Sequence, residues 1–102
     1  MHIISDPQDC ATMRDVRAGV DAVDTALIAL LAKRFAYMRA AARIKPSRDA
    51  VRDEGRKAQV IANARAQAAA AGVPEDAAAA LWELLVESSI AYELNAFDHR
   101  NA

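Results

Sequence analysis

The sequence contains one cysteine, three glycines and three prolines, and only 5% of its residues are aromatic. The single cysteine, Cys10, excludes a disulfide within the chain, and its position near the N-terminus matches no metal-ligand spacing. Alanine is used heavily, and 54% of the residues are hydrophobic. Few helix-breaking residues and many helix-forming ones favour an all-α protein over one built on a β-sheet.

The chain also lacks an excess of basic residues and a long apolar run. Its formal net charge is -1, so no general basic surface is expected to attract nucleic acid. No hydrophobic run approaches the ~20 residues of a membrane span. Residues 1–4 form too short an apolar start for a signal peptide. We therefore expect a cytoplasmic protein that binds neither nucleic acid nor a membrane.

Proline and glycine divide the 102 residues into segments of one domain, 1–102. Pro46 disfavours helical geometry at the residue before it, Gly72 suits a helix C-terminus, and Pro74 suits a first helical turn. Thr12 or Asp9 is expected to cap the first helix. The predicted order is an arm at 1–12, a long helix at 13–45, a mobile active-site loop at 46–53, and helices at 53 or 54–71 and 74 or 75–97.

The long helix carries an apolar seam whose members are spaced alternately three and four residues apart. The seam comprises Met13, Val16, Val20, Val23, Leu27, Leu30, Tyr37, Ala41 and Ile44. A helix of ~30 residues spans ~45 Å, whereas a compact chain of this length has a radius of ~13 Å. The seam therefore needs a partner chain, and we predict an intertwined helical homodimer of three-helix chains.

Arg34 interrupts this seam and must find an anion, because an unpaired buried guanidinium is costly. A salt bridge to a core carboxylate would satisfy it. Lys45 follows eleven residues later, about 20° away in azimuth and ~16 Å along the axis, so the two cations could instead converge on a small dianion. Arg17 lies ~25 Å before Arg34 on a straight helix and could serve the same site only from a second chain.

The last helix adds a second anomaly, because Ser89 and Glu93 lie one turn apart on an otherwise apolar row. Together with Arg17, Arg34, Lys45 and Arg56, this pair describes a pocket for a small dicarboxylate, which arginine binds through parallel hydrogen bonds.

The sequence offers no Ser-His-Asp, Cys-His or metal-ligand set, so no metal and no cofactor are expected. His2 and His99 lie in the terminal segments and are interpreted as solvated surface residues. Any chemistry in the dicarboxylate pocket must therefore come from positioning and electrostatics.

The whole pattern resembles the all-helical chorismate mutases and the related isochorismate-pyruvate lyases, from about residue 9 to residue 97. The resemblance depends on five motifs in combination: Val16-Arg17 with Val20-Asp21-Ala22-Val23-Asp24, Leu30-Leu31-Ala32-Lys33-Arg34, Ala42-Arg43-Ile44-Lys45, Val51-Arg52-Asp53 with Arg56, and Glu87-Ser88-Ser89-Ile90-Ala91-Tyr92-Glu93.

This resemblance implies a homodimer with two equivalent active sites, each built from both subunits. Arg17 would reach one substrate carboxylate from the partner chain, while Arg34 and Arg56 would hold the carboxylates from the same chain. Lys45 would donate to the ether oxygen and to a carboxylate of the substrate. Ser89 would line the ring pocket, and Asp53 would also contact the substrate.

Two residues depart from the usual mutase pattern. Glu93 stands where a glutamine normally faces the ether oxygen, and it would have to be protonated to donate a hydrogen bond there. Lys57 stands where mutases carry a glutamate that contacts the ring hydroxyl, a residue that the lyases also lack.

Three functions follow from these observations. The first is a chorismate mutase that converts chorismate to prephenate. The second is an isochorismate-pyruvate lyase that yields salicylate and pyruvate. The third is a non-catalytic helical dimer that regulates a partner, in which Arg34 and Glu93 pair with each other or with other core charges.

Overall fold

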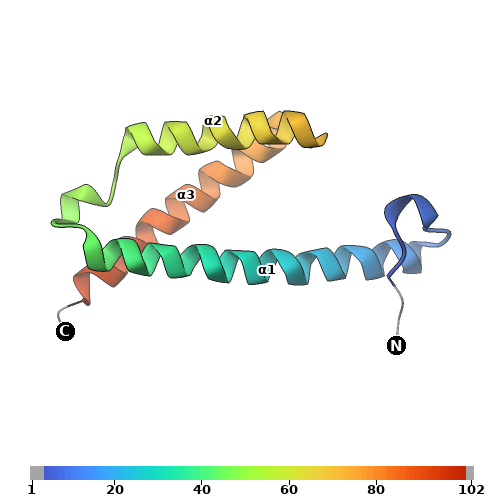
Figure 1. The fold of residues 1–102 in the computed structure, drawn as a ribbon, viewed down its shortest axis with the longest axis horizontal. Coiled ribbons are helices and arrows are strands. Elements are labelled where there is room, and N and C mark those ends of the chain that lie inside the picture. The colour runs from blue at the N-terminus through green and yellow to red at the C-terminus, as the bar shows by residue number, and fades with distance from the viewer. Residues whose placement is uncertain (1–3, 101–102) are drawn as a thin grey trace. The chain divides into compact units, whose positions relative to one another are not determined.

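A computed structural model describes residues 4–100, and within that range the chain is helical and contains no β-strand (Figure 1). Three long helices follow one another: α1 (Met13–Ile44), α2 (Glu54–Ala71) and α3 (Glu75–Asp98). Two 3₁₀ helices, Pro7–Asp9 and Arg48–Ala50, occupy the predicted arm and the predicted loop. The all-α prediction is confirmed, and the helix bounds agree with the predicted ones to within a residue or two.

Thr12 begins α1 through a reciprocal cap. Its hydroxyl accepts a hydrogen bond from the Asp15 amide at 3.2 Å, and the Asp15 carboxylate accepts from the Thr12 amide at 3.2 Å. The same carboxylate also accepts from the Ala11 amide at 3.0 Å. Amides that the first turn would otherwise leave without partners are thereby satisfied.

The chain divides into two compact units, residues 1–36 and 37–102, which we describe separately. In the first unit, the apolar seam of α1 is exposed in the single chain: Val20 is 51%, Val23 58% and Leu30 64% accessible. The arm and this face of α1 enclose an open cavity of about 420 Å³, lined mainly by apolar side chains that include Val16, Val20 and Val23. A single chain therefore leaves the seam without a cover.

In the second unit, α3 returns along α2 after a tight turn (Figure 1). Gly72 closes α2 with φ 77°, a left-handed conformation that glycine adopts without steric cost. Small side chains then allow the two helices to approach closely, and the buried ones are Ala64, Ala68, Ala78 and Ala79.

The segment between α1 and α2 contributes to the hydrophobic core. Val51 is buried there against Val86 and Ile90 of α3, with Leu94 and Phe97 packed around them. The burial of Val51 holds the segment against α3. The mobility of residues 46–53 stays a prediction, and so does the organisation of residues 1–102 as one domain. Other apolar residues of α3, Leu81 and Leu84, remain exposed in the single chain.

Candidate active site

Lys45 and Glu93 form the centre of the candidate site. The Lys45 ammonium Nζ lies 2.6 Å from Glu93 Oε1, and the glutamate side chain is only 5% exposed. Pro46 ends α1 directly after Lys45, whose amide still donates to the Ala41 carbonyl at 2.9 Å. The lysine side chain then crosses from the end of α1 to α3, where it meets a buried carboxylate.

The ammonium of Lys45 also approaches the carbonyl oxygen of Val51, at 3.4 Å. The buried Val51 side chain fixes this carbonyl, so the segment between α1 and α2 helps to orient the lysine. Although Oε1 of Glu93 is close to the ammonium, it has no well-aligned hydrogen-bond donor among residues 4–100. A buried oxygen in this state can accept a hydrogen bond, or can donate one when it is protonated.

Ser89 lies one turn before Glu93 on α3 and is only 4% exposed. Its hydroxyl donates to the Leu85 carbonyl at 2.7 Å, one turn back along the same helix. This internal bond keeps a polar residue satisfied in an apolar setting. The predicted Ser89–Glu93 row is therefore buried on α3.

Asp53 and Arg56 have local roles at the start of α2. Asp53 is the N-cap residue, and its Oδ1 accepts from the Arg56 amide at 3.0 Å. The exposed Arg56 guanidinium donates to Gln59 Oε1 at 2.7 Å. Among residues 4–100, neither side chain forms a hydrogen bond or ion pair with Lys45 or Glu93, and their contribution to substrate binding stays a prediction.

Arg17 and Arg34 lie on α1 in the first unit, where Arg17 is exposed and Arg34 is half-buried. Their convergence on the Lys45 site stays a prediction.

His2 lies outside the described residues, while His99 ends α3 with its Nδ1 2.7 Å from the Asn95 carbonyl oxygen.

Glu87 is the centre of an ion-pair network that the sequence did not predict. Arg52 donates to both of its carboxylate oxygens, at 2.8 and 3.1 Å, and Lys57 donates to Oε2 at 2.8 Å. Lys57 also binds Glu83 at 2.7 Å, and Arg52 binds Glu54 at 2.8 Å. The signal was present, because two carboxylates four residues apart on one helix repel each other unless cations lie beside them.

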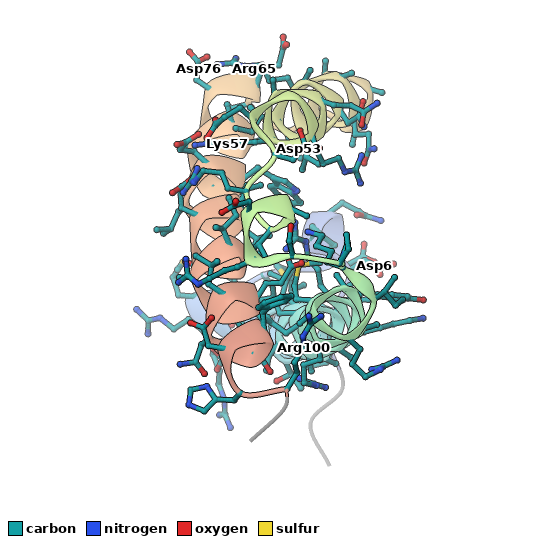
Figure 2. The ribbon with its side chains drawn as sticks, turned by 90° about the vertical axis from the view of Figure 1, so that its left-hand side faces the viewer. Asp6, Asp53, Lys57, Arg65, Asp76 and Arg100 are labelled. Carbon is teal, nitrogen blue, oxygen red and sulfur yellow. The ribbon has the colours of Figure 1, made fainter. Side chains whose placement is uncertain are left out.

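The hydrogen bonds from Arg52, and next those from Lys57, lower the pKa of Glu87 to about 2. Hydrogen bonding to Glu83, followed by that to Glu87, raises the pKa of Lys57. Lys57 is thus held against α3, which Figure 2 shows together with Asp53 at the start of α2. Lys57, one of the two residues that depart from the mutase pattern, therefore forms ion pairs with two carboxylates of its own chain.

A second ion pair binds the same connecting segment to the end of α3. Arg48 Nε lies 2.9 Å from Asp98 Oδ1, and Nη2 donates to Oδ2 at 3.4 Å. Hydrogen bonding to Asp98 raises the pKa of Arg48. Residues 48–52 are therefore anchored to α3 by an arginine at each end and by Val51 between them.

Residues 4–100 contain neither a metal-binding cluster nor a membrane-spanning helix. No group of three or more His, Cys, Asp or Glu side chains there is arranged to hold a metal ion. No helix in that range combines the length and apolar character needed to cross a membrane.

Comparison with known proteins shows a protein family and a relative that this chain resembles. The sequence model of chorismate mutase type II matches residues 16–94, which include every predicted site residue. The chain is also similar to the isochorismate pyruvate lyase of Pseudomonas aeruginosa, with 36% identity over 45 residues. That match covers 44% of this chain and 45% of the relative, so it extends over less than half of either protein.

Proposed function

The chain belongs to the chorismate mutase type II family, and we propose that it converts chorismate to prephenate. One observation carries the proposal within the family: Lys45, directly after the end of α1, forms an ion pair with the buried Glu93 of α3. An intramolecular rearrangement needs neither a nucleophile nor a cofactor. It needs the substrate held in its reactive conformation and donors for the charge that develops on the ether oxygen.

Lys45 and Glu93 supply those donors in different ways. The ammonium always donates, whereas the Glu93 carboxyl donates only when it carries a proton. The two groups pair with each other, and substrate binding would redirect Lys45 toward the ether oxygen and a carboxylate. Ser89 would line the ring pocket, and Asp53 would contact the substrate.

The remaining cations would bind the two substrate carboxylates. Arg34 and Arg56 act from the same chain, and Arg17 arrives from the partner of a homodimer. The exposed seam of α1 supports this dimer, because Val20, Val23 and Leu30 would otherwise remain in water. We place this dimeric enzyme in the cytoplasm.

A second candidate reaction is cleavage of isochorismate to salicylate and pyruvate in the same pocket. The observation that favours it is Lys57, which stands where a mutase carries a carboxylate for the ring hydroxyl and is bound to Glu83 and Glu87. The partial similarity to an isochorismate pyruvate lyase supports the same reading. A non-catalytic dimer would also pair Glu93 with a core cation. Only an activity assay therefore distinguishes the mutase, the lyase and the non-catalytic dimer.

The test is to incubate the purified protein separately with chorismate and with isochorismate and to identify the products by chromatography. Prephenate from chorismate supports the mutase, and salicylate with pyruvate from isochorismate supports the lyase. Arg65→Gln is a suitable control, because Arg65 is not one of the predicted site residues. It lies in the second half of α2 and binds the exposed Asp76 of α3 at 2.9 Å. If the folded protein consumes neither substrate, the mutase and lyase proposals are both wrong, and the non-catalytic regulatory dimer is the remaining proposal.

A further inference from the structure

Three arginines converge on a second pocket that the proposed reaction does not use. The pocket has a volume of about 370 Å³ and is lined by Arg39, Ala42, Arg43, Ala96 and Arg100. All five lining residues belong to the second unit: three lie near the end of α1, Ala96 lies on α3, and Arg100 directly follows α3. Small side chains leave the space open, with Ala42 only 2% exposed, and the arginines supply the rest of the lining.

The charge of the arginines that line this pocket is not paired with a carboxylate of the described residues. None of the lining residues is acidic, and among residues 4–100 none of the three guanidiniums forms an ion pair with a carboxylate. Arg39 donates instead to the Tyr92 hydroxyl at 2.8 Å. By contrast, the second unit pairs Arg48, Arg52 and Arg65 with carboxylates.

Arg100 is held in place before any ligand arrives. Its Nη1 donates to the carbonyl oxygens of Lys45 at 2.7 Å and Ala42 at 3.2 Å, and its guanidinium lies 3.6 Å from the centre of the Phe97 ring. Figure 2 shows Arg100 beside the end of α1. Both bonds use one nitrogen, so Nε and Nη2 keep donors for another acceptor. A fixed guanidinium loses little conformational entropy when it binds an anion.

Arg39 and Arg43 lie one turn apart on the same face of α1. Like charges at this spacing destabilise a helix, so the pair has no stabilising role of its own. An oxyanion between them and Arg100 would remove the repulsion and accept several charge-assisted hydrogen bonds. The volume lies within the range of small-molecule sites and is too small for a folded partner.

We infer that this three-arginine pocket binds a small multivalent oxyanion, of the class of phosphate esters and polycarboxylates. The site is separate from the Lys45–Glu93 pair, because the Lys45 side chain faces Glu93 and Val51 and only its backbone carbonyl contacts Arg100. The inference does not depend on the proposed reaction.

Calorimetric titration of the full chain with inorganic pyrophosphate, at constant ionic strength, tests the inference. A parallel titration with citrate distinguishes phosphate chemistry from polycarboxylate chemistry. We expect saturable binding of one anion per chain. Arg43→Gln should weaken it by about tenfold or more, since a charge-assisted hydrogen bond is lost. Arg39→Gln, on the same helix face, provides a second variant of the pocket.

Arg56→Gln is the matched control, because it removes the same charge from an exposed arginine assigned to substrate binding. It should change the affinity by no more than about twofold, as expected at constant ionic strength for an exposed charge outside the pocket lining. The inference is overturned if neither anion binds saturably. It is also overturned if Arg56→Gln weakens binding as much as Arg39→Gln and Arg43→Gln do. That result would mean that the anion binds outside the three-arginine pocket. Circular dichroism of each variant verifies that the fold is retained.

Discussion

Arg52 binds both carboxylate oxygens of Glu87, with Nη2 at 2.8 Å and Nη1 at 3.1 Å, and so joins the segment before α2 to the middle of α3. Lys57 reaches the same carboxylate from the first turns of α2. Glu87 of α3 therefore binds both α2 and the connecting segment. That segment contains the buried Val51, whose carbonyl oxygen lies beside the Lys45 ammonium.

The first prediction concerns acid stability. The folded-state pKa of Glu87 is lowered to about 2 from a reference value of 4.5. A lowered carboxyl pKa stabilises the folded state above the reference value, and the contribution disappears as pH falls through the folded-state value. The wild type should therefore exceed Glu87→Gln in free energy of unfolding at about pH 5, and the difference should vanish near pH 2.

Urea unfolding at several pH values measures this difference. Glu54→Gln is the control, because it removes a 69% exposed carboxylate from the same arginine and should show a smaller pH dependence. A constant gap between wild type and Glu87→Gln across this range would contradict the network.

The second prediction concerns the dimer and its shared site. Arg17→Ala and Arg34→Ala homodimers should each be folded but nearly inactive, since each removes a carboxylate ligand from every site. If the two arginines serve one site from different chains, mixing the variants should restore roughly one working site per heterodimer. Sedimentation verifies the dimer mass and the exchange of subunits. Verified exchange without recovered activity would rule out the contribution in trans.

The third prediction concerns residues 46–53. Arg48, Val51 and Arg52 anchor this segment to α3, and Lys45 directly precedes it. Its amides should exchange more slowly with deuterium when a dicarboxylate transition-state analogue is bound, because ligand contacts with Lys45 stabilise the closed segment. Amides of α2 near Ala64 serve as an internal reference. Equal exchange with and without saturating analogue would assign the segment a purely connecting role.

The fourth prediction concerns Glu93. Donation to the ether oxygen requires the protonated form of the Glu93 carboxyl, whereas an amide at this position always donates. Glu93→Gln keeps the shape of the side chain, so it should retain activity. Glu93→Ala should lose activity by roughly 10²–10³-fold, the effect of removing one oxyanion donor. Activity of Glu93→Gln as low as that of Glu93→Ala would show that residue 93 does not act as a donor.

The sequence alone was sufficient for the helices, since their signals are local. Pro46 ends α1 near the predicted residue, Gly72 closes α2 in the left-handed conformation that it permits, and alanine favours helix throughout. The burial of Ser89 and Glu93 was also predictable, because both lie on the apolar row of α3. Local spacing along one helix fixes which residues share a face.

Tertiary structure alone decided which charges meet. Lys45 pairs with Glu93, Arg52 and Lys57 share Glu87, and three arginines line a pocket whose described lining contains no acidic residue. The sequence contains 13 basic and 14 acidic residues, so many pairings are compatible with its composition. The choice among them depends on how the connecting segment and α3 approach each other, which the burial of Val51, Val86 and Ile90 determines. Ion pairs act over a few ångströms, and only packing brings residues so far apart in the chain within that range.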